Sequence, residues 1–419
     1  MSLFDVSALL LTLSALFGWA NRRFLHLPRS IGLLLMGLVA SLVLAGVGAV
    51  LPDAPGYVAL REALQQIDFT SVVISGMLAF LVFAGALSVH VPLLRERAGP
   101  VVTLAFVGTL ISTGIVGFGF WGAARLFDYQ LPLAWALVFA ALISPTDPVA
   151  VLNTLRRVNL PKQLQVEIEG EALFNDGVGI VLFTFLLALA AGPGEEHTIG
   201  SALLELVREA GGGLALGCVT GYIAYRAMRT IDDFAVEVLI TLALVTATYA
   251  LAARLGTSGP LAVVAAGLLF GDRAPRDAMS ERTEGYVTAL WTLIDEVLNS
   301  VLFLLIGLEI VLLPYVPGAI RLALCAIPIV LVARFIAVSP PLLWPAWRSK
   351  LSVRNVPFLT WAGVRGGISV ALALSLPDTG HKAAILIATY GVVLFSILVQ
   401  GSTLPALARL TLHKPPPQS

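Results

Sequence analysis

Long apolar stretches alternate with short polar segments along almost the whole chain. Most of the stretches approach the roughly 20 residues that one helix needs to cross a bilayer, although the first and the ninth are barely long enough. The pattern predicts an all-α polytopic membrane protein with thirteen transmembrane helices. We expect them at Val6–Ala20, Ser30–Leu51, Phe69–Val89, Pro100–Ala123, Leu131–Val151, Val166–Ala190, Ser201–Tyr225, Phe234–Ala253, Gly256–Gly271, Tyr286–Leu312, Ala319–Leu343, Pro357–Leu376 and Ala383–Ala406.

The composition agrees with a membrane protein. Of the 419 residues, 58% are hydrophobic and 12% are charged, against about 25% charged in soluble domains. The net charge of zero provides no overall field for nucleic acid, so a nucleic-acid partner is not expected. Asp5 precedes the first apolar run, and Arg22 and Arg23 follow it. This order predicts a retained first helix with its N-terminus outside the cell.

The basic residues test the number of helices independently. Eighteen of the 26 fall in segments that thirteen helices would place in the cytoplasm, against four in outer segments. One miscounted helix would reverse the downstream segments and destroy this bias. We therefore expect a cytoplasmic C-terminus and a single transmembrane unit over residues 1–419, with residues 407–419 as a short disordered cytoplasmic tail.

Two of the predicted helices are interrupted. Helix 5 contains S-P-T-D-P at 144–148, where two prolines break the helix and Asp147 can cap a second half-helix that begins at Pro148. Helix 12 contains G-V-R-G-G at 363–367, where Arg365 could face the negative carbonyl end of the first half-helix. Helices 5 and 12 cross in opposite directions, as in an inverted repeat of helices 1–6 and 8–13. Matched interruptions of this kind indicate a transporter's midplane site.

Helix 6 carries the polar stretch E-A-L-F-N-D-G, Glu171–Gly177, inside an apolar run. Asp176 lies about 15 Å along the helix from Val166, near the middle of the bilayer. An ionised group there costs about 2.5–3.5 kcal/mol on insertion scales, so it is rarely kept without a use for its charge. Asp176 could exchange a proton for a hard monovalent cation. The alternative is a protonated, hydrogen-bonded packing residue. Glu171 and Asn175 share one helix face, and Asp176 is turned about 100° from Asn175.

The arginines within the membrane need counter-ions. Arg365 is expected to pair with Glu171 or Asp147, and because a guanidinium keeps its proton, that pair would be structural. Arg334 of helix 11 could pair with a carboxylate of helix 10, either Glu296 or Asp295.

Motifs of membrane enzymes and pumps are missing from the predicted helices. The five histidines fall in loops or at helix ends, and no H-E-x-x-H, serine–histidine pair or P-loop lies in the membrane. We therefore expect neither an enzyme nor a bound cofactor. Asn299 and Ser300 could line a cavity or bond neighbouring helices.

The three motifs T-D-P, F-N-D-G and G-x-R-G-G, in this order over thirteen helices, resemble the monovalent cation/proton antiporter-1 family. Within it the chain is similar to the NhaP-type bacterial and archaeal sodium/proton antiporters, which are related to the animal sodium/proton exchangers. The resemblance implies an NhaA-like antiporter fold and a homodimer in the plasma (inner) membrane. It also implies a core bundle, including helices 3–6 and 10–13, that moves against a dimerisation domain.

The resemblance also implies roles for single residues. Asp176 would bind either the cation or the proton, and Asn175 would belong to the Asn-Asp pair of exchangers regarded as electroneutral. Thr146 and Asp147 would join Asp176 as transient sodium ligands. Glu171 and Arg365 would form the ion pair that holds helix 6 against helix 12.

The function implied is a secondary exchange of sodium or lithium for protons by alternating access, in which cation and proton compete for Asp176. One alternative is a potassium/proton antiporter. An alternative of another class is an ion channel or a membrane sensor on the same scaffold. Ala172 and Ala84 stand where archaeal members carry a serine and a glutamate, which bears on ion coordination and selectivity.

Overall fold

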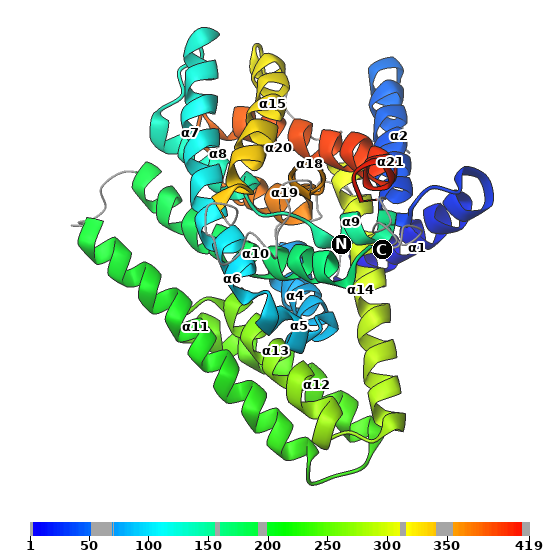
Figure 1. Cartoon of the computed structure of the whole chain (residues 1–419). Coiled ribbons are helices and arrows are strands. Elements are labelled where there is room, and N and C mark those ends of the chain that lie inside the picture. The colour runs from blue at the N-terminus through cyan, green and yellow to red at the C-terminus, as the bar shows by residue number, and fades with distance from the viewer. Residues whose placement is uncertain are drawn as a thin grey trace, which may run out of the picture.

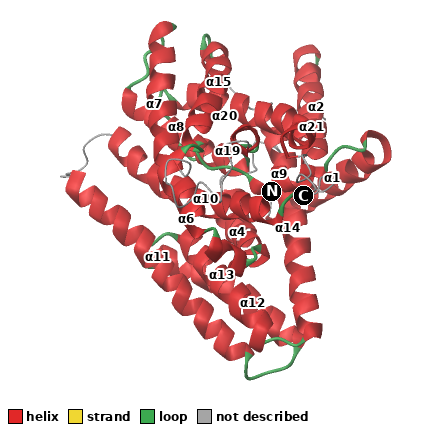
Figure 2. Cartoon of the chain, in the orientation of Figure 1, coloured by secondary structure: helices red, strands yellow, loops and turns green. Residues whose placement is uncertain are grey.

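The structure is a computed structural model that describes residues 3–51, 69, 71–155, 160–191, 199–310, 316–340 and 355–412. Within these ranges the chain forms helices joined by short connections, and no strand is present (Figure 2). The predicted outer loop at 52–68, the end of predicted helix 11 and residues 413–419 lie outside the described residues.

Several of the helices can cross a membrane. Within the described ranges, nine helices are long and apolar enough to do so. They are Phe4–Leu25, Arg29–Gly48, Ala98–Leu126, Leu133–Leu155, Lys162–Ala190, Phe234–Arg254, Glu281–Glu309, Ala319–Ala337 and Lys382–Thr411. The protein is therefore a multi-pass helical membrane protein.

The first half of the chain, up to the long helix α10, contains several helices with π-helical turns, written η. The elements are α1 (Leu3–Ala20), η1 (Asn21–Leu25), α2 (Arg29–Val50), η2 (Ser71–Met77), α4 (Leu78–Ser88), α5 (Val91–Glu96), α6 (Ala98–Val102), η3 (Thr103–Gly108), α7 (Thr109–Leu126), α8 (Leu133–Ile143), α9 (Pro148–Leu155) and α10 (Lys162–Ala190).

The second half begins with the longest helix. The elements are α11 (Ile199–Met228), α12 (Phe234–Arg254), α13 (Gly259–Asp277), α14 (Glu281–Glu309), α15 (Ala319–Ala337), α18 (Val356–Trp361), α19 (Gly367–Leu374), α20 (Lys382–Phe395), η6 (Ser396–Gln400) and α21 (Gly401–Leu412). Side-chain caps define several starts, because Asp233, Ser258 and Ser280 each accept a backbone hydrogen bond at the head of α12, α13 and α14.

The helices pack in two groups. In the first, which we call the bundle, α8 packs on α7 and α10, and α15 packs on α7 and α20. In the second, which we call the scaffold, α13 packs on α4, α11 and α12, and α14 packs on α2 and α4. Figure 1 shows α11, α12 and α13 together on the side opposite α7, α15 and α20. The first half of α14 shares a buried hydrophobic cluster with α4 and α13, and α7, α8 and α20 contribute to another.

The expected division into a core bundle and a dimerisation domain stays a prediction. Helices 3 and 10 of the sequence pattern, expected in the core, correspond to α4 and α14, which pack on α13 and α2 respectively. The close approach of α14 to α2 rests on glycines, because a Cβ on Gly307 would lie 2.6 Å from the backbone oxygen of Leu34.

The tail expected to be disordered, residues 407–419, begins inside a helix. The helix α21 continues through Leu412.

Both predicted helix interruptions are confirmed. The helix α8 ends at Ile143, where Ser144 and Pro145 follow, and α9 begins at Pro148. In the other half of the chain α18 ends at Trp361 and α19 begins only at Gly367. The two non-helical stretches touch, because the amide of Asp147 donates to the carbonyl oxygen of Val364 at 2.7 Å. The two breaks therefore lie against each other inside the protein.

Candidate functional site

Arg365 lies at the carbonyl end of half-helix α8. Its Nη1 donates to the backbone oxygens of Ser144 and Pro145, the latter at 3.0 Å. The side chain is 1% exposed. The guanidinium thus satisfies carbonyl groups that the interruption leaves without helical partners, and its charge complements the negative end of the half-helix dipole. The sequence prediction for this contact is confirmed.

Asp147 occupies the opposite position, at the amino end of half-helix α9. Its Oδ1 accepts hydrogen bonds from the amides of Val149 at 2.9 Å and Ala150 at 3.2 Å. This is the predicted N-cap, in which a carboxylate meets the positive end of the helix. Much of the charge of Asp147 is therefore engaged by the backbone of its own chain segment.

The Asp147 carboxyl group also lies directly against the second interruption, at Gly366. A Cβ on Gly366 would overlap this group, with Cγ only 2.8 Å away. We expect Gly366→Ala to lower the free energy of unfolding by about 1–3 kcal/mol, because Asp147 or the α19 start must shift. Thermal unfolding in detergent measures this. The matched control is Gly122→Ala in α7, where a Cβ meets nothing within 4 Å. Equal melting temperatures for the two variants would contradict the close approach.

Asn175 joins α10 to the first interruption. Its Nδ2 donates to Thr146 Oγ1 at 2.9 Å, and its Oδ1 accepts from the amide of Thr146 at 3.4 Å. Asn175 is 1% exposed and Thr146 is 6% exposed. The amide therefore holds the non-helical segment against α10 by two hydrogen bonds.

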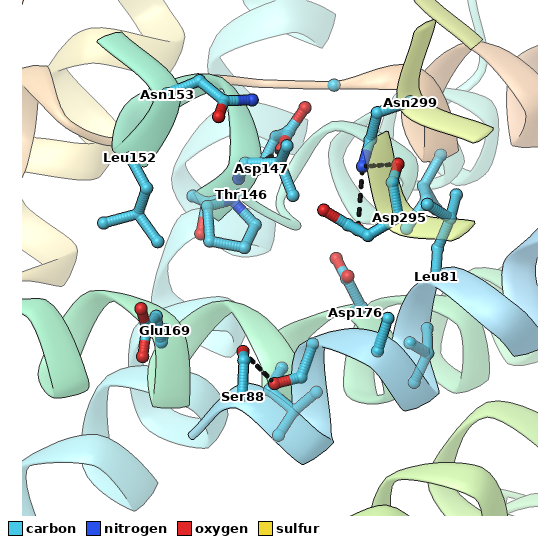
Figure 3. Close-up of a pocket in the computed structure, with 18 of the residues that line it drawn as sticks. Leu81, Ser88, Thr146, Asp147, Leu152, Asn153, Glu169, Asp176, Asp295 and Asn299 are labelled. Atoms are coloured by element: carbon cyan, nitrogen blue, oxygen red, sulfur yellow. Dashed lines mark hydrogen bonds between the residues drawn. The ribbon is translucent and has the colours of Figure 1, made fainter. Parts of the chain in front are cut away.

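Asp176, the next residue of α10, faces a cavity of about 820 Å³. Figure 3 shows its carboxyl group pointing into the space beneath Asp147 and Thr146. Among the described residues, none donates a hydrogen bond to Asp176 or pairs with it. Glu171 and Asn175 do not line this cavity. The predicted separation of faces on this helix is thus confirmed.

The expected partner of Glu171 was wrong. Glu171 pairs with Arg334 of α15 and not with Arg365. The two nitrogens of the Arg334 fork meet the two oxygens of Glu171, with Nη2 to Oε2 at 2.8 Å, and Arg334 Nε donates to the Leu359 oxygen in α18 at 3.3 Å. Glu171 and Arg334 are 2% and 8% exposed in their side chains. Arg365 instead donates to the backbone oxygens of Ser144 and Pro145, just after the end of α8.

The two α14 carboxylates that were expected as possible partners of Arg334, Glu296 and Asp295, make other contacts. Glu296 pairs with Arg29 of α2 at 2.7 Å. Asp295 Oδ1 accepts a hydrogen bond from Asn299 Nδ2 at 2.9 Å. Asn299 lines the cavity, whereas Ser300 donates to the backbone oxygen of Glu296.

Among the polar lining residues, Glu169 on α10 and Ser369 on α19 were not singled out from the sequence, and Asp295 on α14 was considered only as a partner of Arg334. The four-residue spacing of Asp295 and Asn299 on one helix face was the available signal. Of the two alanines that depart from the archaeal pattern, Ala84 lines the cavity, whereas Ala172 is buried and does not.

Crossed half-helices beside a carboxylate that faces a cavity, within a multi-pass helical protein, define a membrane transporter of the broken-helix class. The family model for the transmembrane sodium/hydrogen exchanger matches residues 11–410. The chain belongs to the sodium/hydrogen exchanger family.

Two of the curated relatives align with this chain along nearly their whole length. The chain is 42% identical to the Na(+)/H(+) antiporter NhaP of Pseudomonas aeruginosa, over 97% of this chain and 96% of that protein. It is 36% identical to the Na(+)/H(+) antiporter NhaH of Halobacillus dabanensis, over 93% of each. The fold is similar to that of the sodium proton antiporter MjNhaP1 from Methanocaldococcus jannaschii, with a TM-score of 0.75 and 21% identity over 98% of this chain and 99% of that one.

Proposed function

We propose that this protein is a secondary antiporter that exchanges sodium or lithium ions for protons across the cell membrane, with Asp176 as the group that carries either ion. The observation that supports this most is the position of Asp176, which faces a cavity beside the crossed half-helices and has no partner among the described residues. The names of the relatives NhaP and NhaH, both Na(+)/H(+) antiporters, agree with it.

The contacts of the other carboxylates favour competition between cation and proton at one carboxylate, Asp176. Asp147 is held by the amides at the start of α9, and Glu171 is held by Arg334. Asp176 is left to bind a hard cation through its oxygens or to take up a proton, but not both at once. Thr146 and Asp147 line the same cavity and are proposed to supply further oxygens to the cation.

We further propose an alternating-access cycle in which the bundle moves against the scaffold. The cavity lies between them and extends to Leu160 and Lys162, near the end of α9 and the start of α10. The predicted topology, with the N-terminus outside, assigns this end to the cytoplasm, so the cavity corresponds to an inward-open state. Thirteen crossings with an inverted repeat remain our proposal, and the homodimer stays a prediction.

Exchange of one cation for one proton, without net charge transfer, follows from a single exchanging carboxylate. Asn175 is neutral and is occupied with Thr146, so it adds no second charge to the site. Reconstituted protein should therefore exchange sodium for protons at the same rate whether the membrane voltage is clamped or free. A rate that follows the clamped voltage would contradict electroneutral exchange.

The function itself is tested in proteoliposomes with a trapped pH indicator and an imposed gradient of sodium, lithium or potassium. Proton movement driven by sodium or lithium is expected. Movement driven by potassium alone would indicate the potassium antiporter. A current across a bilayer that is far larger than an alternating-access cycle can sustain would indicate a channel. An absence of proton movement would indicate a sensor.

Competition also predicts a definite pH dependence. As pH falls, protons occupy Asp176, so the apparent KM for sodium should rise by up to about tenfold per pH unit once the site is mostly protonated. Initial rates at several sodium concentrations and pH values measure this. An apparent sodium affinity that is independent of pH would contradict competition for one group.

A further inference from the structure

The transport cavity has two walls with different chemistry. The bundle contributes Asp147, Asp176 and Glu169, whereas the scaffold contributes residues of α4 and α14. The α4 residues of the wall are apolar apart from Ser88, whose hydroxyl donates to the backbone oxygen of Gly85 at 2.8 Å. Polar chemistry on the scaffold wall therefore comes mainly from α14.

One stripe of α14 faces the cavity. The stripe recurs every three to four residues, as one face of a helix does, and consists of Thr288, Trp291, Thr292, Asp295, Asn299 and Leu302. Asp295 is the carboxylate of this stripe. Asn299, one turn further, donates from Nδ2 to Asp295 Oδ1 and to the backbone oxygen of Asp295, both at 2.9 Å. This contact fixes the direction of the Asp295 side chain.

The orientation of the stripe is set by the scaffold. Trp291, one turn before Asp295, is 2% exposed and lies 4.6 Å from the Phe83 ring of α4, measured between ring centroids. Its Nε1 donates to Thr241 Oγ1 of α12 at 3.0 Å. Asp295 is thus attached to the scaffold, while Asp176 and Asp147 belong to the bundle.

The three carboxyl groups share one space. In Figure 3 the side chains of Asp147, Asp176 and Asp295 point into the same cavity from three different elements. The described lining carries four carboxylates, with Glu169 as the fourth, and one basic group, Lys162. Adjacent like charges favour the binding of a cation from the cavity, because it relieves their repulsion.

We propose that Asp295 is a second cation-binding carboxylate of the cavity, which captures the monovalent cation from the scaffold wall and assists its transfer to Asp176. This inference rests on the proposed function. When the bundle moves, Asp176 and Asp147 move with it and Asp295 stays behind. Asp295 therefore raises the affinity for the cation at one face of the membrane only, without being the group that carries it.

The test is the apparent KM for sodium in right-side-out and everted membrane vesicles. Asp295→Asn should raise this KM about three- to tenfold at the face onto which the cavity opens, the effect of one charge in a partly screened cavity. It should leave the KM at the other face within about twofold, and it should leave the maximal rate nearly unchanged. Asp295→Glu, which keeps the charge, should restore most of the affinity.

The matched control is Glu296→Gln, which removes the neighbouring carboxylate of α14 that pairs with Arg29 and does not line the cavity. Its KM for sodium should equal that of the wild type at both faces. An unchanged KM in Asp295→Asn, an equal rise at both faces, or a loss of maximal rate alone would overturn the inference. Wild-type vesicles that exchange no sodium for protons would instead overturn the proposed function.

Discussion

Asp176→Asn should reduce sodium/proton exchange to the level of protein-free liposomes. An amide at this position neither binds a proton near neutral pH nor presents a negative charge to sodium, so both half-reactions are lost together. Asp147 and Glu171 do not replace it, because Asp147 is held by the amides of α9 and Glu171 is held by Arg334. Asp295 lies on α14 of the scaffold and is not proposed to move with the bundle. The measurement is the proton flux driven by a sodium gradient in proteoliposomes.

Loss of exchange counts only if the variant is folded. The substitution is nearly isosteric and removes a carboxylate that has no partner among the described residues, so the melting temperature should stay the same or rise. The control is Asp378→Asn, where the carboxylate is 96% exposed and pairs with Lys382 four residues away. Its exchange rate should equal that of the wild type. Residual exchange by folded Asp176→Asn would refute the assignment of the carrier group.

The second large effect is expected on stability, at the pair of Glu171 and Arg334. Removing either partner should lower the free energy of unfolding by about 3–5 kcal/mol, because the other charge stays buried and unpaired. Glu171→Gln and Arg334→Gln are the variants, and thermal unfolding in detergent is the measurement. The double variant should recover a large part of the loss, since no unpaired charge then remains.

Exposed pairs provide the comparison. Asp378→Asn, which breaks the exposed pair with Lys382, should change the stability by no more than about 0.5 kcal/mol. Asp176→Asn should also destabilise the protein far less than Glu171→Gln, although both remove a carboxylate from α10. Similar losses of stability in all three variants would contradict the distinction between Glu171, as half of a structural ion pair, and Asp176, as the group that carries the ion.

Local sequence determined a large part of this protein. The apolar runs predict a multi-pass membrane protein because the bilayer excludes unpaired backbone polar groups and admits helices of about 20 residues. The positions of both interruptions follow from residues in the interruptions themselves, since proline lacks an amide hydrogen and glycine accepts unwound backbone. The cap by Asp147 follows from its place just before Pro148.

Helix periodicity also determined how α10 divides its polar residues. Residues four apart share a face, so Glu171 and Asn175 were expected on one side and Asp176 on another. In the structure the first two make protein contacts and Asp176 lines the cavity. This prediction needed only the geometry of a single helix.

Only the tertiary structure decided which charges meet. Arg334 and Arg365 are both buried in the membrane-spanning part of the chain. The sequence motifs allowed Glu171 or Asp147 as the partner of Arg365, and the family resemblance implied Glu171. In the structure Glu171 pairs with Arg334, and Arg365 donates to the backbone oxygens of the two residues that follow α8. The same is true of Asp295, whose place in the cavity depends on how α14 packs against α4 and α12. Periodicity fixes the faces of one helix, but the partner of a face depends on packing between segments distant in sequence.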